Sequence, residues 1–372
     1  MEACNNPFLL HPTFIVLSLC HHSFPRLSRF DSVQNCEAEA WPGCKTTLTD
    51  KEDAEEEGEQ EGGGFWHGEM AEQSEKKLKE AEKMVKKADK ITTLSFTNWA
   101  ADWAQATPLY EQAGLAYKLA KQSARAKHCY EKAATGQERL SSQWTAAKHL
   151  EIAGQLAKEL EDWAEVKDLY KRASELYMYC GKPQPAADAL VKGARAIEDK
   201  DSDAAVKMYI DSCSMLEEDG REQMAFDTYR AATNLFIKLK RYSDAASMLL
   251  RWGQSADKCK AIQSLCKAYI GAIIVYLYSG DLKGAQQCHN DCTQVDAFLN
   301  SEQNMLAENL LKAYREGDGE EIKYVVQSSK VIPHLDHMIV RLAKQLPTSP
   351  MTPGVGTSNQ GPSDGLDDDD LT

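Results

Sequence analysis

The sequence predicts an all-α fold built from stacked helical hairpins, and two observations support this prediction. Between residues 70 and 346 the apolar residues recur at spacings of three and four, proline is rare, and no run alternates with a period of two. The same stretch repeats itself after 40 residues: Ala106, Ala113, Gly114, Tyr130 and Ala133 are matched by Ala146, Ala153, Gly154, Tyr170 and Ala173. The small residues let two helices approach closely, and the tyrosine fills the gap to the next pair.

A period near 40 with two helices per unit is typical of a right-handed α-solenoid of the tetratricopeptide kind, with longer helices or turns than the usual unit of ~34 residues. Short polar turns precede an alanine in each copy, as in KQSARA, LEDWAE, DKDSDA and LKRYSDA. The most apolar stretch, at 269–278, is about half the ~20 residues that a membrane span requires. We therefore expect a buried helix there.

Residues 1–69 differ from the repeats in composition. They hold 13 acidic and 4 basic residues and include the charged run KEDAEEEGEQEGGG at 51–64, which cannot bury enough apolar area to order itself. The apolar stretch at 7–19 lacks a basic leader and is interrupted by histidine and proline, so no secretory signal is expected. Because a strong helix-forming run opens at Met70, we expect residues 1–69 to be a disordered extension or a mis-assigned start.

The distribution of charge limits the partners and the compartment. The chain has 43 Lys and Arg against 57 Asp and Glu, but residues 70–350 carry 39 of each, so the excess of acid lies in the two ends. Nucleic-acid binding needs a local excess of basic residues, so no nucleic-acid partner is expected. Eleven cysteines without framework spacing predict free thiols and a cytoplasmic protein.

The sequence contains no motif that favours an enzyme. The pair Gly181-Lys182 lacks the upstream glycine and the following Ser or Thr of a phosphate loop. The segment CHNDC at 288–292 offers possible metal ligands without a second, equally clear pair, so a structural role is the simpler expectation. We therefore expect a binding module without catalytic residues, metal or cofactor. An enzyme built on a solenoid remains a third possibility if an undetected site exists.

Three features go beyond a generic helical repeat. The loop ITTLSFTNW, which begins at Ile91 after a basic helix, predicts either an interfacial membrane patch or a packed cap of the first repeat. Residues 111–150 hold seven basic residues against three Glu, which predicts either a stripe for an acidic partner or an ordinary solvated surface. After a Pro-, Gly- and Ser-rich linker, residues 347–372 end in LDDDDLT, a flexible acidic tail that contains a leucine.

These features together resemble the soluble NSF attachment proteins, the SNAP adaptors. The resemblance rests on the 40-residue hairpins, the apolar loop after the first helix and the penultimate leucine behind an acidic run, and it extends over positions 70–372. The segments WAADWAQATPLYEQAG, SELYMYCGKPQPAADAL and LEEDGREQMAFDTYRAA look most like the gamma class of this family. Residues 1–69 match nothing in the pattern.

The resemblance implies a solenoid of about 14 helices that ends in a small helical bundle at residue 346. It implies an adaptor that binds assembled SNARE complexes of the syntaxin type and recruits and stimulates the hexameric AAA ATPase NSF. The expected role is SNARE disassembly in vesicle fusion and intracellular protein transport. The expected location is cytoplasmic, with peripheral attachment to membranes of vacuolar, Golgi or endoplasmic-reticulum trafficking.

The resemblance also assigns roles to individual residues. It implies a membrane-attachment loop formed by Ile91, Leu94, Phe96 and Trp99, and SNARE-binding basic residues at Lys182 and Arg230. It implies that NSF is bound and stimulated through Glu316, Asp367, Asp368, Asp369, Asp370 and Leu371. The chain departs from the family pattern where Asp188 and Phe226 replace basic residues of the SNARE surface, and where Lys312 and Arg315 replace acidic residues near NSF. These departures leave open how strongly the chain binds SNARE complexes and which SNARE complex it prefers.

The competing prediction is a generic tetratricopeptide-like scaffold or a co-chaperone that binds an acidic peptide. Such a protein needs a clamp of Lys and Asn residues that lines one groove at a regular spacing of ~34 residues. The sequence shows neither this period nor an obvious clamp.

Overall fold

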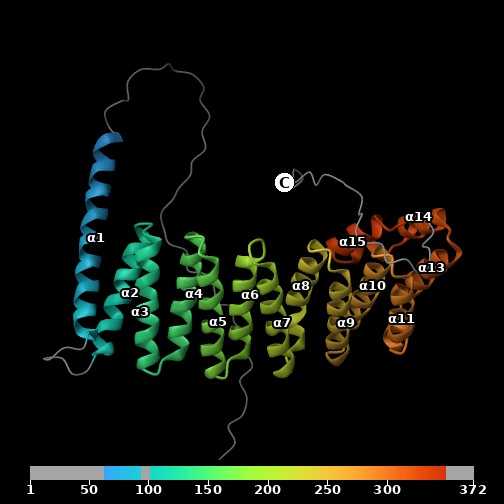
Figure 1. Cartoon of the computed structure of the whole chain (residues 1–372), viewed down its shortest axis with the longest axis horizontal. Coiled ribbons are helices and arrows are strands. Elements are labelled where there is room, and N and C mark those ends of the chain that lie inside the picture. Colours follow the sequence, from blue (N-terminus) through green and yellow to red (C-terminus); the bar gives the residue numbers. More distant parts are fainter. Residues whose placement is uncertain (1–62, 94–100, 349–372) are drawn as a thin grey trace, which may run out of the picture. The chain divides into compact units, whose positions relative to one another are not determined.

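The computed structural model describes residues 63–93 and 101–348, with side chains from Glu75 onward, and all of these residues lie within Gln60–Thr372. Every regular element in these ranges is a helix, and no strand occurs in them (Figure 1). The predicted all-α fold is therefore confirmed. The expected regions 1–69 and 347–372 lie almost wholly outside the described residues.

Fifteen α-helices and two short 3₁₀-helices follow one another along the described chain. The first half consists of α1 (Gly63–Thr92), α2 (Trp103–Leu119), α3 (Ser123–Arg139), α4 (Gln143–Glu159), α5 (Trp163–Tyr179), α6 (Pro183–Ile197) and α7 (Ser202–Glu218). The second half consists of η1 (Glu222–Ala225), α8 (Phe226–Lys238), α9 (Tyr242–Lys258), α10 (Ile262–Tyr278), α11 (Leu282–Cys292), α12 (Asp296–Leu299), α13 (Glu302–Glu316), α14 (Gly319–Ser328), η2 (Ile332–His334) and α15 (His337–Lys344).

The first helix begins earlier than the sequence predicts, at Gly63 rather than Met70. Extending a formed helix adds one hydrogen bond for each residue fixed, whereas a new helix must first form a costly nucleus. A run of strong helix formers can therefore extend its helix backwards through residues of weaker propensity.

Near-equal helices and short turns give the row a regular spacing, so that α2, α3, α4 and α5 begin at 103, 123, 143 and 163. The residue after the C-cap has a left-handed conformation at most of the turns, namely at Lys121, Ser141, Glu161, Gly181, Gly220, Lys240, Lys260 and Gly280. The next backbone N–H bonds back across the turn, as from Gln122 to the Tyr117 carbonyl at 2.9 Å. This bond is the six-to-one bond of a Schellman motif, and its donor is already the N-cap of the following helix. In each such turn the residue that closes the Schellman motif also starts the next helix, so the chain reverses without further loop residues.

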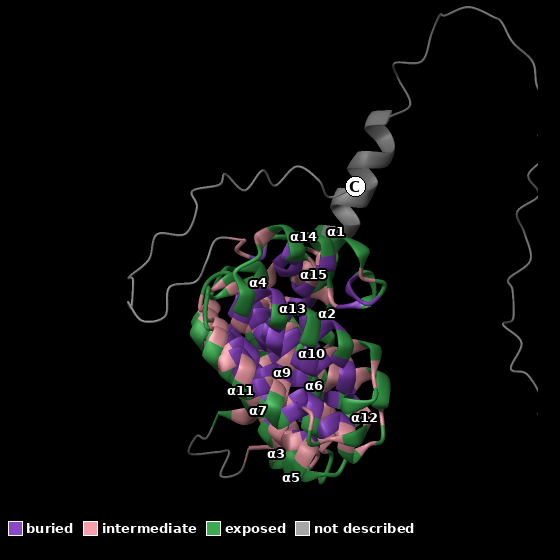
Figure 2. Cartoon of the chain, turned by 90° about the vertical axis from the view of Figure 1, so that its right-hand side faces the viewer, coloured by how far each residue is buried: buried purple, intermediate pink, exposed green. Residues whose placement is uncertain are grey.

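Close packing between the helices is provided by small residues and tyrosines, as the sequence predicts. A Cβ added at Gly114 would lie 3.2 Å from the Tyr130 ring, and one at Gly154 would lie 2.8 Å from the Tyr170 ring. Buried residues lie on the helix faces that meet in the interior, and exposed residues lie on the outside (Figure 2). The small-then-aromatic pattern thus sets the separation of neighbouring helices.

A third copy, in which the sequence repeats the pattern as Ala186, Gly193, Ala194 and Tyr209, departs from this packing. A Cβ at Gly193 would meet Met208 and Tyr170 rather than Tyr209. The Tyr209 hydroxyl instead donates a hydrogen bond to Glu198 at 2.5 Å. The predicted packing therefore holds for the first two copies and changes partner in the third.

The C-terminal part contains the expected buried helix and a group of short helices. Residues 268–275 of α10 are all buried, and α13 and α15 both pack against this helix. A Cβ at Gly271 would lie 3.7 Å from Ile339 of α15. The described chain has one helix more than the fourteen implied by resemblance, and α12 is a single short turn.

Candidate partner-binding surface

Successive helices run in alternating directions, so the turns lie at two opposite edges of the row. One edge, the lower one in Figure 1, carries the end of α1, the start of α2, and the turns that follow α3, α5, α7 and α9. We call it the lower edge, and the edge with the turns that follow α2, α4, α6, α8 and α10 the upper edge. The two are separated by the length of one helix, about 25 Å.

Lys182 lies at the lower edge as the N-cap residue of α6. Its backbone N–H donates to the Tyr177 carbonyl at 3.0 Å, which fixes the turn. Its side chain is exposed and makes no ion pair with the residues that the structure describes. The ammonium group is thus held on a rigid turn and faces solvent.

Arg230 lies one turn into α8, nine residues after the lower-edge turn that ends at Arg221, and its charge is partly compensated. It forms an ion pair with Asp227 on the preceding turn of the helix. Asp336, the residue before α15, also interacts electrostatically with Arg230 and with Lys267 of α10. Burial raises the pKa of Asp336, and the two basic residues oppose that shift. A carboxylate from the C-terminal segment therefore lies close enough to Arg230 for their charges to interact.

The two positions of the expected SNARE surface that depart from the family pattern, Phe226 and Asp188, have different environments. Phe226 is half-buried at the start of α8 and packs against the Trp252 ring at a centroid distance of 6.0 Å. Asp188 is exposed on α6, where desolvation raises the pKa of its carboxyl group and Lys192 opposes the shift. An aromatic residue at 226 is therefore part of the packing between α8 and α9, whereas Asp188 contributes a negative charge to the α6 surface.

Of the four residues expected in the membrane-attachment loop, the structure describes one. Ile91 is half-buried and packs against the small cluster formed by Ala88, Ala106, Tyr110 and Ala133. For Ile91 alone, this packing is that of a residue in the cap of the first repeat. Leu94, Phe96 and Trp99 lie outside the described residues.

The residues expected to contact NSF are only partly described. Glu316 is exposed in the last turn of α13, where Lys312 and Arg315 are exposed as well. The Arg315 guanidinium donates to the Leu311 carbonyl at 3.2 Å. Asp367, Asp368, Asp369, Asp370 and Leu371 lie outside the described residues. The structure does not bring Glu316 together with Lys182 and Arg230, which belong to α6 and α8.

The seven basic residues between 111 and 150 do not form one stripe. Lys121 and Arg125 lie at the upper edge, and Arg139 and Lys148 lie at or near the lower edge. Several are also neutralised: Arg125 pairs with Glu82 at 2.8 Å, and Lys127 pairs with glutamates of α3 and α5. Of the two alternatives, these positions favour an ordinary solvated surface over a single stripe, because helix reversal separates residues that are close in sequence.

The CHNDC segment is part of the packing of α11. Cys288 and Cys292 are buried, and the neighbouring thiol of Cys288 together with burial raises the pKa of Cys292. His289 Nε2 lies 2.8 Å from Asn304 Oδ1. Within residues 75–93 and 101–348, no group of three or more His, Cys, Asp and Glu is placed to hold a metal ion. These contacts agree with the structural role expected for this segment.

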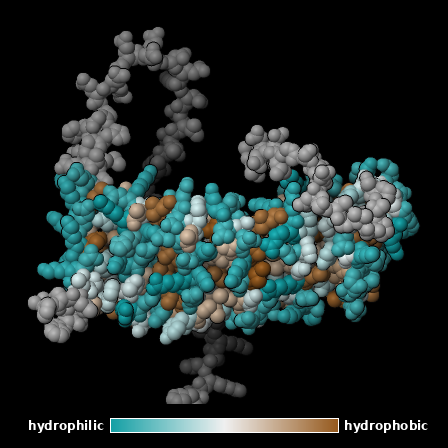
Figure 3. Space-filling view, viewed as in Figure 1, coloured by the Kyte–Doolittle hydropathy of each residue, from teal (hydrophilic) through white to brown (hydrophobic). Residues whose placement is uncertain are grey.

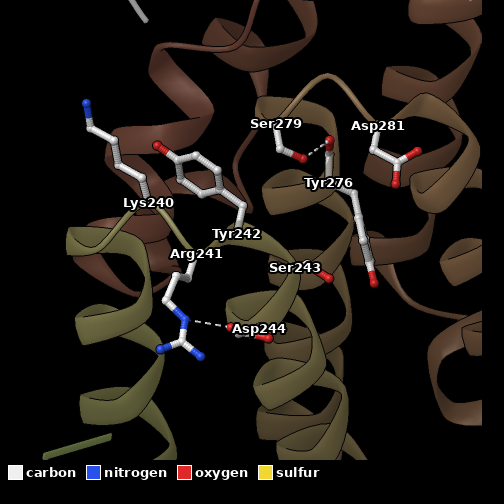
Figure 4. A pocket seen from close by; sticks show the side chains of 8 residues that line it. All are labelled: Lys240, Arg241, Tyr242, Ser243, Asp244, Tyr276, Ser279 and Asp281. Carbon is white, nitrogen blue, oxygen red and sulfur yellow. Dashed lines mark hydrogen bonds and ion pairs between the residues drawn. The ribbon is translucent and has the colours of Figure 1, made fainter. Parts of the chain in front are cut away.

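A depression at the upper edge lies between the turns that follow α8 and α10. It has a volume of about 360 Å³ and is lined by Lys240, Arg241, Tyr242, Ser243, Asp244, Tyr276, Ser279 and Asp281 (Figure 4). Arg241 Nε donates to Asp244 at 2.7 Å and its Nη1 to Asp203 at 3.0 Å, so the guanidinium is already paired. The side chains that line the depression do not converge on a common point (Figure 4).

Sequence reasoning missed two features. Asp336 beside Arg230 could not be found, because the two residues are far apart in sequence and no motif links them. The second feature is the contact between Trp144 of α4 and Tyr177 of α5, with ring centroids 4.9 Å apart. The only signal for it was the occurrence of aromatic residues near successive lower-edge turns.

Among the described residues, none of the helices combines the length and the apolar composition of a membrane-spanning segment.

Comparisons with known proteins agree on one family. The model of the family described as "Soluble NSF attachment protein, SNAP" matches residues 72–346. The chain is 53% identical over 291 residues to the gamma-soluble NSF attachment protein of Arabidopsis thaliana, in an alignment that covers 78% of this chain and 98% of that protein. It is 28% identical over 276 residues to the gamma-soluble NSF attachment protein of Dictyostelium discoideum, covering 74% and 85%. It is 25% identical over 308 residues to the vesicular-fusion protein SEC17 of Komagataella phaffii, covering 79% and 100%.

Proposed function

The chain belongs to the soluble NSF attachment protein family, and we propose that it is an adaptor that binds assembled SNARE complexes and recruits NSF to disassemble them. In this role the protein supplies a binding surface, and the ATPase supplies the chemical energy. The observation that carries the proposal is the match of a SNAP family model across 72–346, together with 53% identity to a gamma-type relative that is covered almost completely.

The architecture suits an adaptor that grips a rod-shaped partner. Most helices of the row are fixed to the next by a short turn with its own backbone hydrogen bonds, so the row resists bending at the turns. Repeated hairpins present equivalent surface positions at regular intervals, which allows contacts along a partner's length. A rigid surface can also transmit the force that an ATPase applies.

Charged contacts allow such an adaptor to bind its partner reversibly. Lys182 is exposed at the lower edge before α6, and Arg230 is exposed on α8 about halfway between the two edges. Exposed ion pairs are individually weak and are screened by salt. We therefore propose that SNARE binding is salt-sensitive and that these two side chains contribute to it, while Asp188 and Phe226 reduce the basic charge of the surface.

The proposal includes peripheral attachment to trafficking membranes in the cytoplasm. Leu94, Phe96 and Trp99 are the proposed lipid contacts beside Ile91, and they raise the local concentration of the adaptor near membrane-anchored SNAREs. Glu316 and the acidic tail with Leu371 are the proposed contacts with NSF.

The direct test is ATP-dependent disassembly of a soluble, purified SNARE complex by NSF, with the full chain as the only adaptor. We expect disassembly that falls several-fold when Lys182→Ala and Arg230→Ala are combined. Lys238→Ala with Lys240→Ala is the matched control, because both lysines are exposed around an upper-edge turn. Absence of binding to any SNARE complex would overturn the proposal and favour the competing prediction of a generic helical-repeat scaffold.

A further inference from the structure

The lower edge carries exposed apolar side chains at two neighbouring turns. Leu140 and Trp144 flank the turn that follows α3, and Met178 and Tyr179 end α5 at the next turn of this edge. Tyr179 is 78% exposed, Leu140 43%, Met178 40% and Trp144 38%. We call these four residues the edge patch. Exposed leucines also occur at consecutive upper-edge turns, at Leu119 and Leu160, so the contacts and charges around the edge patch decide whether it is a binding surface.

The four residues belong to one surface because the two turns are in contact. The Trp144 ring packs edge-on against Tyr177, one residue before Met178. Glu138, which precedes the first of these turns, is paired with Arg172 of α5 at 2.5 Å and ties the same two segments together. The hydropathy of the visible face is mixed, with apolar side chains set between hydrophilic ones (Figure 3). A patch spread along an edge in this way suits a flat partner better than a peptide that needs a groove.

The charges beside the edge patch identify the kind of partner. Within the turns 139–143 and 179–183 the charged side chains are Arg139 and Lys182, both basic and exposed. Lys148 lies over the Trp144 ring at 5.2 Å. Of the nearby carboxylates, Glu138 is occupied by Arg172, and Glu175 is exposed one turn before Tyr179, so the basic residues exceed the free acidic ones beside the patch. Aromatic side chains with adjacent Lys and Arg are the composition that favours the headgroup region of an anionic bilayer.

The backbone holds the patch ready for such a contact. The N–H of Ser142 donates to the Gln137 carbonyl at 2.8 Å, and the N–H of Lys182 donates to the Tyr177 carbonyl at 3.0 Å. Both turns are therefore closed by their own hydrogen bonds, and no loop must be ordered when the patch meets a surface. The end of α1 at Thr92 and the start of α2 at Trp103 lie at the same edge, so a membrane attached there would face this patch.

We propose that Leu140, Trp144, Met178 and Tyr179, with Arg139 and Lys182, form a second membrane contact that binds anionic phospholipid bilayers. This inference rests on the proposed peripheral membrane attachment and extends it from one loop to the first three turns of the lower edge. Lys182 would then lie at the boundary between lipid and SNARE complex. Two separate contacts fix the orientation of the row of helices relative to the membrane, which one loop cannot do.

The test is flotation of the full chain, without SNAREs, with vesicles of phosphatidylcholine and phosphatidylserine mixed two to one. The variant Leu140→Ser/Tyr179→Ser changes two exposed side chains that no described hydrogen bond uses, so we expect it to fold like wild type. The matched control is Leu119→Ser/Leu160→Ser, at upper-edge turns, where Leu119 is 73% and Leu160 40% exposed. We expect the edge variant to lose about tenfold in vesicle affinity, the scale for partial burial of two large apolar side chains. The control variant should bind like wild type.

Each other outcome overturns the inference. Equal binding by the edge variant and wild type would show that the patch does not touch lipid. Equal losses in the edge and control variants would show non-specific adsorption of apolar residues. Binding of wild type to pure phosphatidylcholine as strongly as to the anionic vesicles would remove the role of Arg139 and Lys182. Disassembly of soluble SNARE complexes by the same variants reads the adaptor function separately, and it should be unchanged by the edge variant.

Discussion

Gly253 of α9 lies directly against the ring of Tyr269 of α10, so closely that a Cβ at position 253 would overlap the ring. The ring cannot move away freely, because it is buried and packs edge-on against Phe298 at a centroid distance of 5.5 Å. We expect Gly253→Ala to lower the free energy of unfolding by about 1–3 kcal/mol through overpacking. Urea unfolding followed by circular dichroism measures this change.

Gly271 of α10 provides the matched control in the same pair of helices. A Cβ there would lie 3.5 Å from Leu249, an ordinary van der Waals distance. Alanine is favoured over glycine in a helix interior by about 1 kcal/mol, so Gly271→Ala should be neutral or stabilising. If both substitutions destabilise equally, close approach at Gly253 does not determine the packing.

The left-handed turn residues give a second prediction. Lys121 has a φ of 56°, a conformation that costs about 1 kcal/mol or more for a residue with a Cβ and little for glycine. Its side chain is exposed and forms none of the described ion pairs, so Lys121→Gly should raise the free energy of unfolding by about 0.5–1 kcal/mol. The reverse change, Gly181→Ala at a φ of 64°, should lower it by a similar amount. A drop in the thermal unfolding midpoint of Lys121→Gly would contradict this account.

A half-buried ion pair joins the helices where η1 interrupts the regular spacing. Arg251 of α9 donates two hydrogen bonds to Glu217 of α7, at 2.9 and 2.7 Å, and a third to Ser214 at 2.8 Å. The hydrogen bond to Glu217 raises the pKa of Arg251 above its usual value. We expect Arg251→Met to cost about 3 kcal/mol, because it leaves a half-buried carboxylate without its cation.

The comparison for this prediction is Arg172→Met. Arg172 pairs with Glu138 at 2.5 Å on exposed surface, where ion pairs contribute about 0–1 kcal/mol. Chemical denaturation of both variants compares the half-buried Arg251–Glu217 pair with the more exposed Arg172–Glu138 pair. Equal losses in the free energy of unfolding would show that the partial burial and hydrogen bonds of the Arg251–Glu217 pair add nothing to the stability that a surface ion pair gives.

The periodicity of small residues predicted the repeating fold because it reports directly on packing. Gly154 and Tyr170 recur with the repeat, and the structure places them in contact. Sequence reasoning did not identify the left-handed turn position, because Lys121, Ser141 and Glu161 are not glycine and carry no turn signal. It also missed the change of partner at Gly193, which depends on how Met208 fills the space.

The candidate binding residues were predicted less completely. Lys182 and Arg230 came from resemblance, and their positions at the N-cap of α6 and in the first turns of α8 depend on helix boundaries that the sequence did not give. The proximity of Asp336 to Arg230 was beyond sequence reasoning, because it depends on how the C-terminal helices fold back onto α10. Linear charge patterns were also misleading, as the separation of Lys121 from Arg139 shows.

The environment of Asp336 predicts a pH dependence of stability. Burial raises the pKa of this carboxyl group, with Arg230 and Lys267 opposing the shift and Asp227 adding to it. A raised pKa means that the native state binds the proton more tightly than the unfolded state, so stability falls as pH rises from the unfolded-state pKa through the native pKa. Asp336→Asn should therefore unfold at a higher temperature than wild type at pH 7, with a difference that shrinks toward pH 4. Its carboxylate caps no backbone N–H, so the substitution removes no capping bond. A difference that grows toward pH 4 would contradict this assignment.

The tail residue Leu371 gives the sharpest test of coupling to NSF, because the proposed function assigns SNARE binding to the helices and stimulation of NSF to the tail. Leu371→Ala removes an apolar side chain from the acidic sequence LDDDDLT while leaving α1–α15 intact. We expect unchanged binding to SNARE complexes and a several-fold lower rate of NSF ATP hydrolysis in their presence. Asp367→Asn is the matched control, since it alters one of four adjacent acidic residues and should have a small effect. Unchanged ATP hydrolysis with Leu371→Ala would remove the leucine from the mechanism and leave Glu316 on α13 as the proposed contact to test next.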